Sequence, residues 1–260
     1  MLIGVNVTSG PSANFARQAV DRAAVGFTEL LLDNFLHLDP DDVAQQVPGP
    51  VTFHIMWSRF AHRSEADLIK LAAVIRRWID RLQPLYVSDH LLAHECDGVL
   101  LPEPVEVDYD DDRVVAAAGR WQDMLDVPLL LENAASAVGH QQDQIDMFLE
   151  LQRRHGIHVL FDVSNAVVSE LNGTQSATRW MTSGLRLEHC HISGYRRLDT
   201  DPPLYVDSHD APVSARSWAI LAALISTQGA PRTLVVERDG EVDTKEWQAD
   251  IEQSARLVSA

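Results

Sequence analysis

Short apolar runs alternate with longer amphipathic stretches from one end of the chain to the other. The apolar runs have the length of buried strands, whereas apolar residues in the longer stretches recur with the period of a helix. The runs predicted to be strands lie at residues 2–7, 28–32, 51–55, 85–88, 129–132, 158–163, 187–192 and 233–237. Because strands that alternate with helices form parallel sheets, the pattern indicates an α/β fold of repeated β/α units.

The helical stretches have recognisable ends. The most regular one covers residues 64–82, and Ser64 is predicted to be its N-cap residue. Gly156 and Gly229 lie where two further helices are expected to stop, because glycine tolerates the backbone conformation that ends a helix. The other predicted helices cover residues 112–125, 141–154, 213–226 and 244–258.

The length of the chain fits one closed barrel. Its 260 residues match a single (β/α)8 TIM barrel, a fold that typically needs about 250 residues. We therefore expect one catalytic domain at residues 1–260. The segment 94–111, with Pro102, Pro104 and several acidic residues, follows neither the helical nor the strand period. It is predicted to be an insertion after the fourth strand that lies over the active face.

The composition restricts the partners of the protein. The 38 acidic and 21 basic residues give a formal net charge of -17, which repels nucleic-acid phosphate, so we expect no nucleic-acid partner. We expect no membrane span, since uncharged apolar runs are too short for one, and no secretory signal precedes the first strand. These features favour the cytoplasm. Cys96 and Cys190 predict neither a disulfide framework nor a cysteine-based zinc site.

Polar side chains lie in the third to eighth predicted strands, mostly at their ends, or in the loops that follow them. They are His54, Asp89, His90, Glu132, Asn133, Asp162, Asn165, His189, His191, Asp207, His209, Glu237 and Asp239. The C-terminal ends of barrel strands converge on one cavity, where so many ionisable groups need compensation by cations. Imidazole and carboxylate ligands without thiolate suit iron, manganese or zinc. The sequence therefore predicts a metal site.

Each of these residues also has an ordinary structural interpretation. A single histidine at a strand end is more often a hydrogen-bonded core residue, and a single acid is often the N-cap of the next helix. Six successive strands that end this way favour the metal site. Cys190, between His189 and His191, is predicted to face the helix layer. The ordinary interpretation is preferred for His62, His94, His140, His155 and His158.

Six short motifs carry a resemblance to a known family. They are Ser88-Asp89-His90-Leu91, Leu131-Glu132-Asn133, Asp162-Val163-Ser164-Asn165, His191-Ile192-Ser193-Gly194, Asp207-Ser208-His209 and Val236-Glu237-Arg238-Asp239. In order and spacing they resemble the multinuclear non-haem iron-dependent oxidative enzymes, a family known for methanobactin biosynthesis. More distantly the layout is similar to xylose isomerase-like sugar isomerases and to barrel-type apurinic endonucleases. The resemblance implies a xylose isomerase-like barrel.

The resemblance also implies a set of metal ligands. It assigns the first metal to His54, His90 and Glu132, the second to Glu132, Asp162, His191 and Glu237, and a third, weaker one to Asn165, Asp207 and His209. Glu132 would bridge the first two metals. The endonucleases generally have histidine at the position of Asn165, which favours oxidation here. The chain departs from the family at Ser164, often asparagine, and at His189 and Tyr195, where the family often has glutamate and a second histidine.

The function implied by the resemblance is oxidation of a peptide. Two or three iron ions in a mixed-valent Fe(II)/Fe(III) state would use O2 to modify a residue, commonly cysteine, of a ribosomally made precursor peptide. His90, Glu132 and Asp162 would be the catalytic residues. A separate partner protein is expected to bind the leader peptide. Four arginines after strand ends either contact the substrate or are solvated, namely Arg59, Arg63, Arg196 and Arg197.

Two other functions remain open at this point. A sugar isomerase or epimerase would use one or two manganese or magnesium ions and an acid-base pair, although the many histidines argue against it. The barrel could also be a non-catalytic metal-binding or peptide-binding partner that has kept ancestral ligands. Loss of turnover on replacing His90 or Asp162 would distinguish an enzyme from such a scaffold.

Overall fold

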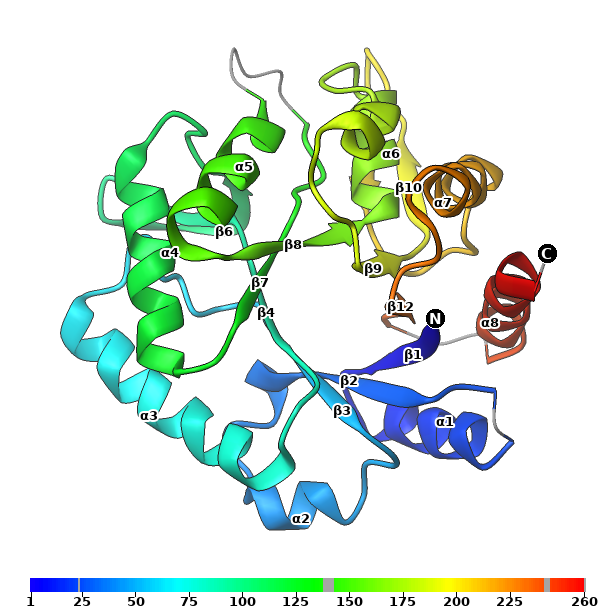
Figure 1. The fold of residues 1–260 in the computed structure, drawn as a ribbon, viewed down its shortest axis with the longest axis horizontal. Helices are drawn as coiled ribbons and strands as arrows, with labels where there is room; N and C mark the ends of the chain where they lie inside the picture. Colours follow the sequence, from blue (N-terminus) through cyan, green and yellow to red (C-terminus); the bar gives the residue numbers. More distant parts are fainter. Residues whose placement is uncertain (23, 138–142, 241–243, 260) are drawn as a thin grey trace.

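The protein forms a closed barrel of eight parallel strands with helices outside it (Figure 1). The computed structural model describes residues 1–22, 24–137, 143–240 and 244–259. The barrel strands are β1 (Leu2–Val7), β2 (Phe27–Leu31), β3 (Val51–Ile55), β4 (Val87–His90), β7 (Leu129–Glu132), β8 (His158–Asp162), β9 (His189–Ile192) and β12 (Thr233–Val236). They are hydrogen-bonded in the order β1-β12-β9-β8-β7-β4-β3-β2, and the ring closes between β2 and β1. The predicted TIM barrel is confirmed.

One strand prediction was displaced. The fourth strand was expected at residues 85–88, whereas β4 covers Val87–His90, so Asp89 and His90 belong to the strand itself. Leu85 lies at the N-terminal rim and is half exposed, which is why its apolar side chain gave a misleading signal. The shift matters for the site because backbone pairing with β7 fixes the position of His90 beside Glu132.

The helices cover the outside of the barrel. They are α1 (Gly10–Asp21), α2 (Pro40–Ala44), α3 (Glu65–Leu82), α4 (Asp112–Leu125), α5 (Gln144–His155), α6 (Val163–Leu171), α7 (Ala215–Gln228) and α8 (Thr244–Ser259), with 3-10 turns η1 (Leu32–Asn34) and η2 (Ala177–Thr182). The Ser64 side chain accepts a hydrogen bond from the Asp67 N–H, as expected of an N-cap. The predicted start of the helix at 141–154, and His140, lie outside the described residues.

Two β-hairpins extend from the C-terminal end of the barrel. The predicted insertion at 94–111 contains most of the first, formed by β5 (Leu92–Cys96) and β6 (Val99–Glu106) directly after β4. The second follows β9 and consists of β10 (Tyr195–Leu198) and β11 (Leu204–Asp207). The sequence did not predict this second hairpin, because each of its strands has only four residues and none of those residues is fully buried.

The two faces of the barrel strands differ in chemistry. Alternate residues such as Phe53, Leu131 and Phe161 are buried with helix residues in the main apolar core. Cys190 is fully buried in the same core, in agreement with its predicted orientation. Several of the intervening positions are polar as well as buried, among them Glu29, Thr52, Glu132, Asp162 and His191. A TIM-barrel interior is normally filled by branched apolar side chains, so these polar residues require an explanation.

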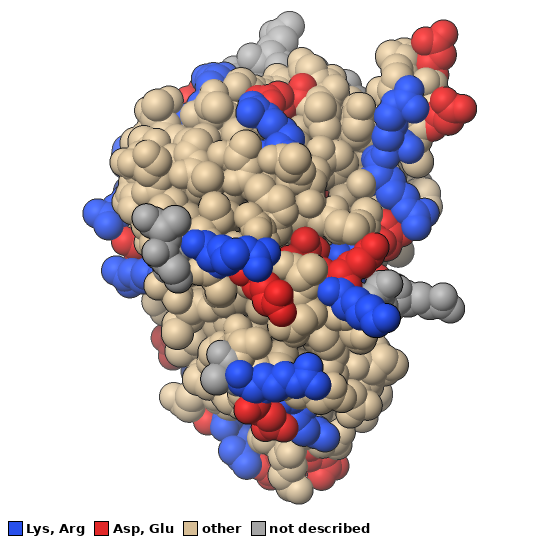
Figure 2. Space-filling model, turned by 90° about the vertical axis from the view of Figure 1, so that its right-hand side faces the viewer, with Lys and Arg blue, Asp and Glu red and all other residues tan. Residues whose placement is uncertain are grey.

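The surface carries both signs of charge. On the face shown in Figure 2, Lys and Arg side chains lie close to Asp and Glu side chains on a mostly uncharged background. Within the described residues, no helix is long and apolar enough to cross a membrane.

Candidate metal centre

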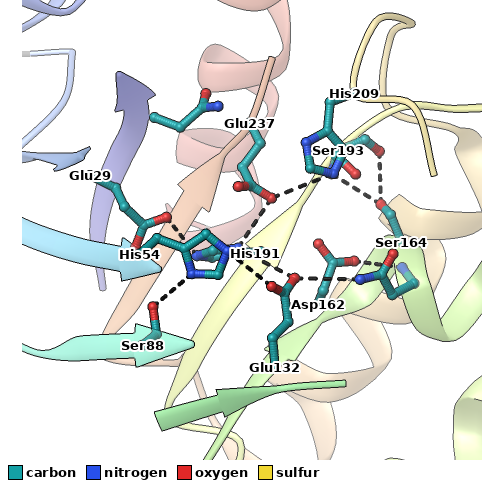
Figure 3. A network of polar contacts seen from close by, with 12 residues as sticks. Glu29, His54, Ser88, Glu132, Asp162, Ser164, His191, Ser193, His209 and Glu237 are labelled. Atoms are coloured by element: carbon teal, nitrogen blue, oxygen red, sulfur yellow. Dashed lines mark hydrogen bonds and ion pairs between the residues drawn. The ribbon is translucent and has the colours of Figure 1, made fainter. Parts of the chain in front are cut away.

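Glu132, at the end of β7, lies at the centre of the polar cluster (Figure 3). Its Oε2 atom is 3.2 Å from His54 Nε2 and 3.1 Å from His90 Nε2. Its Oε1 atom is 3.6 Å from His191 Nδ1 and 3.4 Å from the Asn165 side-chain nitrogen. One carboxylate thus faces both halves of the cluster, as a bridging ligand must.

The second half of the cluster is formed by strands β8, β9 and β12. His191 Nδ1 lies 3.1 Å from Glu237 Oε2. One possible ligand atom from each of Glu132, Asp162, His191 and Glu237 lies within 4.8 Å of the others. These are the residues that the family resemblance assigned to the second metal. His54, Glu132 and His191 form another such group, whereas His90 belongs to neither and contacts only Glu132 among these acids.

The residues predicted for a third metal are only partly brought together. His209 Nε2 is 2.7 Å from Asp207 Oδ2 and 3.9 Å from Glu237 Oε2. Asn165 instead donates hydrogen bonds through its side-chain nitrogen to Glu132 Oε1 and to the Asn133 carbonyl. The structure therefore brings Asp207 and His209 beside Glu237, and Asn165 beside Glu132.

Asp162 serves two purposes at once. Its Oδ1 atom accepts a hydrogen bond of 2.5 Å from the Asn165 N–H, and so caps the N-terminus of α6. Its Oδ2 atom is buried and has no hydrogen-bond partner. The ordinary interpretation of this strand-end acid and the metal-ligand interpretation are compatible, because each uses a different oxygen.

The outer nitrogen of each central histidine faces a protein group. The four contacts are His54 Nδ1 with Ser88 Oγ at 2.8 Å, His90 Nδ1 with the Ile55 carbonyl at 3.0 Å, His191 Nε2 with Glu29 Oε1 at 2.8 Å and His209 Nδ1 with Asp239 Oδ2 at 3.1 Å. Metal-ligating histidines are usually held in this way by groups behind them. Each ring therefore presents its other nitrogen to the carboxylates.

Several buried atoms of the cluster lack hydrogen-bond partners. Among the described residues they include Glu132 Oε2, Asp162 Oδ2, Asn165 Oδ1, His191 Nδ1, His209 Nε2 and Glu237 Oε2. Leaving buried ionisable groups unsatisfied is costly, and a bound cation would remove that cost. A cavity of about 30 Å³ adjoins these residues and is lined in part by His54, His90 and Glu237. The donors fit a multinuclear site for iron, manganese or zinc.

The ionisation of the carboxylates reflects this crowding. Burial raises the pKa of Asp162 well above its ordinary value, and the negative charges of Glu132, Asp207 and Glu237 raise it further. Burial also opposes ionisation of Glu132, but His90, His191 and His54 outweigh it and hold the pKa of Glu132 well below its ordinary value. Burial lowers the pKa of His90 to about 4, so its ring is neutral and able to ligate.

Other strand-end residues do not face the centre. Asp89 accepts hydrogen bonds from the Trp121 indole and from the His90 N–H, so it faces α4. Asn133 joins two strands through hydrogen bonds with the Asp162 backbone. The four arginines contact protein groups. Arg59 pairs with Glu95, Arg196 with Asp210 and Arg197 with Asp199, while Arg63 donates to the Ser58 carbonyl.

Sequence reasoning gave no role in the centre to Glu29 or Asn6. Glu29 contacts His191, and the Asn6 side chain donates to Asp239 Oδ1 at 2.9 Å while its own oxygen accepts from the Arg238 N–H. Polar residues inside the two apolar strand runs were the available signal. It could not show which ligand the residue supports, because the partners lie more than 150 residues away in the sequence.

The comparisons with known proteins agree with this geometry. Residues 6–259 match the family described as RiPP precursor modification enzyme MbnB/TglH/ChrH. A UPF0276 protein of Bordetella pertussis is 33% identical over 241 residues, which are 84% of this chain and 80% of that protein. A Caulobacter UPF0276 protein is 33% identical over 181 residues, and this match spans 65% of the chain but only 64% of that relative.

Solved structures show the same fold at low identity. An L-ribulose 3-epimerase matches with a TM-score of 0.65 and 13% identity, over 100% of this chain and 98% of that one. Endonuclease IV from Thermus thermophilus matches with a TM-score of 0.61 and 14% identity, over 100% and 99% of the two chains. Both confirm the xylose isomerase-like barrel and nothing beyond the fold. Because the family match covers nearly the whole sequence, the chain belongs to the MbnB/TglH/ChrH family of RiPP precursor modification enzymes.

Proposed function

We propose that this protein is a multinuclear non-haem iron-dependent oxidase that uses O2 to modify a cysteine residue of a RiPP precursor peptide. The observation that carries the proposal is the convergence of buried histidine and carboxylate atoms that have no hydrogen-bond partner. A RiPP modification enzyme with such a set of donors has little use for it other than metal-dependent chemistry.

The proposed ligands divide into three positions. His54, His90 and Glu132 would hold the first iron, Glu132, Asp162, His191 and Glu237 the second, and Asn165, Asp207 and His209 a third. The first position has one carboxylate and the second has three, so the second favours the more highly charged ion of a mixed-valent Fe(II)/Fe(III) pair. Bound iron would supply the one-electron chemistry that the side chains themselves cannot provide.

The protein side chains would orient the reactants and exclude water. Glu132, Asp162, His191 and Glu237 are at most 4% exposed, so charges within the cluster are screened only weakly by solvent. His90 lies closer to the surface than these four, and its side chain is 13% exposed. We assign His90, Glu132 and Asp162 to the catalytic centre because Glu132 is shared by the first two metal positions, and His90 and Asp162 would each supply a ligand to one of them.

The precursor peptide would be delivered by a separate partner protein that binds its leader. The net charge of -17 favours basic leader segments by its sign. Size-exclusion chromatography of the protein with a precursor peptide, with and without a small protein encoded nearby, tests this part. Complex formation that requires the second protein is the expected result.

The oxidase proposal is tested with protein purified without oxygen. Metal analysis is expected to find two or three iron ions per chain, and mass spectrometry is expected to show a modified peptide only after O2 is admitted. His90→Ala and Asp162→Ala should abolish turnover, whereas His158→Ala, an exposed histidine at the start of β8, should not. A protein that carries zinc alone, or that modifies the peptide without O2, would contradict the proposal.

The sugar isomerase interpretation has no comparable support. The similarity to an L-ribulose 3-epimerase at 13% identity concerns the barrel alone. The same purified protein, loaded with Mn²⁺ and offered ketopentoses, is expected to leave them unchanged.

A further inference from the structure

Glu29 is a buried carboxylate that the three proposed metal positions do not use. It lies on β2 inside the barrel, and its side chain is 1% exposed. A carboxylate in a barrel interior is costly unless charged or polar partners surround it, and this layer is normally apolar. The partners of Glu29 therefore indicate what the residue does.

The two oxygens of Glu29 have different partners. Oε2 accepts hydrogen bonds from the Thr52 hydroxyl at 2.9 Å and from the Tyr86 hydroxyl at 3.0 Å. Oε1 accepts no hydrogen bond from a hydroxyl group and lies 2.8 Å from His191 Nε2 (Figure 3). Two donors on one oxygen fix the carboxylate plane, so the other oxygen is held against the imidazole.

His191 is oriented differently from the other three histidines of the centre. His54, His90 and His209 turn Nε2 toward the carboxylates of the metal centre, whereas His191 turns Nδ1 toward Glu237 and Glu132. The nitrogen that faces Glu29 is Nε2, on the far side of the ring. A carboxylate in this place can hold the ring so that Nδ1 is free for a metal.

We propose that Glu29 is a positioning residue that fixes the His191 ring with Nδ1 toward the second metal position, and that Thr52 and Tyr86 hold Glu29 in place. Glu29 is not itself a member of either group of possible ligand atoms found within 4.8 Å of one another among the described residues, although His191 belongs to both. The inference rests on the proposed metal site but not on iron, O2 or a peptide.

Cobalt titration of the full-length metal-free protein tests the proposal, because Co²⁺ reports its ligands through its visible absorption bands. The variants are Glu29→Gln, which keeps an acceptor of the same size, and Glu29→Leu, which removes the acceptor. Glu29→Leu should weaken the Co²⁺ position that contains His191 by about 100-fold and shift its bands, and Glu29→Gln by about 10-fold, the range found when such supporting groups are lost. If Glu29 merely filled space, the similarly sized Gln and Leu should affect Co²⁺ binding alike, so a smaller effect of Gln supports the positioning role.

Two further variants complete the experiment. Tyr86→Phe removes one donor to Glu29 Oε2 and should weaken the same Co²⁺ position less than Glu29→Gln does. Glu188→Gln is the matched control, because Glu188 pairs with Arg186 and Arg232 just before β9, at the opposite end of that strand from the centre. It should bind Co²⁺ as the wild type does.

The outcomes are decisive for the proposal. Wild-type affinity and spectrum in Glu29→Leu would overturn it. If neither Glu29 variant folds, as judged by circular dichroism, Tyr86→Phe decides, since an unchanged Co²⁺ complex would then overturn the proposal. A wild-type protein that binds Co²⁺ as expected but oxidises no peptide would refute the proposed function and leave this inference intact.

Discussion

At the scale of single residues, His209 combines an uncommon backbone conformation with several fixed contacts. Its φ angle is 51°, in the left-handed region that non-glycine residues seldom occupy. Its N–H donates to the Gly194 carbonyl, its own carbonyl accepts from the Asp239 N–H, and its Nδ1 contacts the Asp239 carboxylate. Strained residues of this kind persist where their surroundings fix them, and they cluster at functional sites.

Loss of the Asp239 carboxylate should release the His209 ring. We expect Asp239→Ala to lose the metal proposed for the third position, at Asp207 and His209, while keeping those proposed for the other two. Only His209 loses the group behind its ring. Metal analysis after gel filtration measures the loss. Asp210→Asn is the control, since Asp210 pairs with the exposed Arg196 nearby. Loss of all metals from Asp239→Ala would show that the residue supports the whole centre instead.

The two thiols should differ sharply in reactivity. Cys190 is fully buried, and burial raises the pKa of its thiol, whereas Cys96 is exposed. Because the thiolate is the reactive form, a disulfide reagent should modify one thiol per native chain and two after unfolding. Cys96→Ser should abolish the native reaction. Rapid modification of that variant without denaturant would show that Cys190 is accessible.

At the scale of elements, Asp162 joins a strand end, a helix cap and the proposed metal centre. It ends β8, and the next residue begins α6, so one side chain must serve the helix and the centre together. The contribution of Asp162 to helix stability and its contribution to metal binding can be separated by the choice of the residue that replaces it.

Asp162→Asn should keep the cap and lose the ligand. Asparagine caps helices well, so metal-free Asp162→Asn should be at least as stable as the wild type, since it also relieves crowding with Glu132. Asp162→Ala should be about 0.5–2 kcal/mol less stable than Asp162→Asn in urea unfolding. Both should lose metal at the second position. Ser64→Ala, at the cap of α3, should lose stability but no metal. Equal stability of the two Asp162 variants would argue against the capping role.

The elements also show how far a sequence can be interpreted alone. All eight barrel strands were predicted because each is a short apolar run between polar turns, and α3 and α4 were predicted because one of their faces is polar. Helix α6 was missed because most of its residues are buried, which removes the polar face that reveals a helix. The family resemblance supplied nine ligand candidates, which stay predictions. The position of Glu29 behind His191 depends on how the strands of the closed barrel align, which the sequence does not reveal.

At the scale of the whole molecule, the barrel and its metal centre should stabilise each other. The carboxylates of Glu132, Asp162 and Glu237 lie close together in an interior with little solvent. They lie at the ends of β7 and β8 and directly after β12, on one side of the ring. Without a cation, burial and then the repulsion of neighbouring carboxylates disfavour the charged form of Asp162, and both raise its pKa. With a cation the same residues hold the strands together.

Thermal unfolding should therefore depend strongly on metal. A ligand present at 100 times its Kd stabilises the native state by about 2.7 kcal/mol, so added Mn²⁺ or Fe²⁺ should raise the Tm and a chelator should lower it. Glu132→Gln should respond much less, because it removes the carboxylate shared by the first two positions. Glu188→Gln, at the other end of the barrel, should respond like the wild type. The two variants make the same Glu-to-Gln change at opposite ends of the barrel. If metal shifted the Tm of both variants equally, the cation would bind elsewhere, and protons alone would relieve the repulsion among the buried acids.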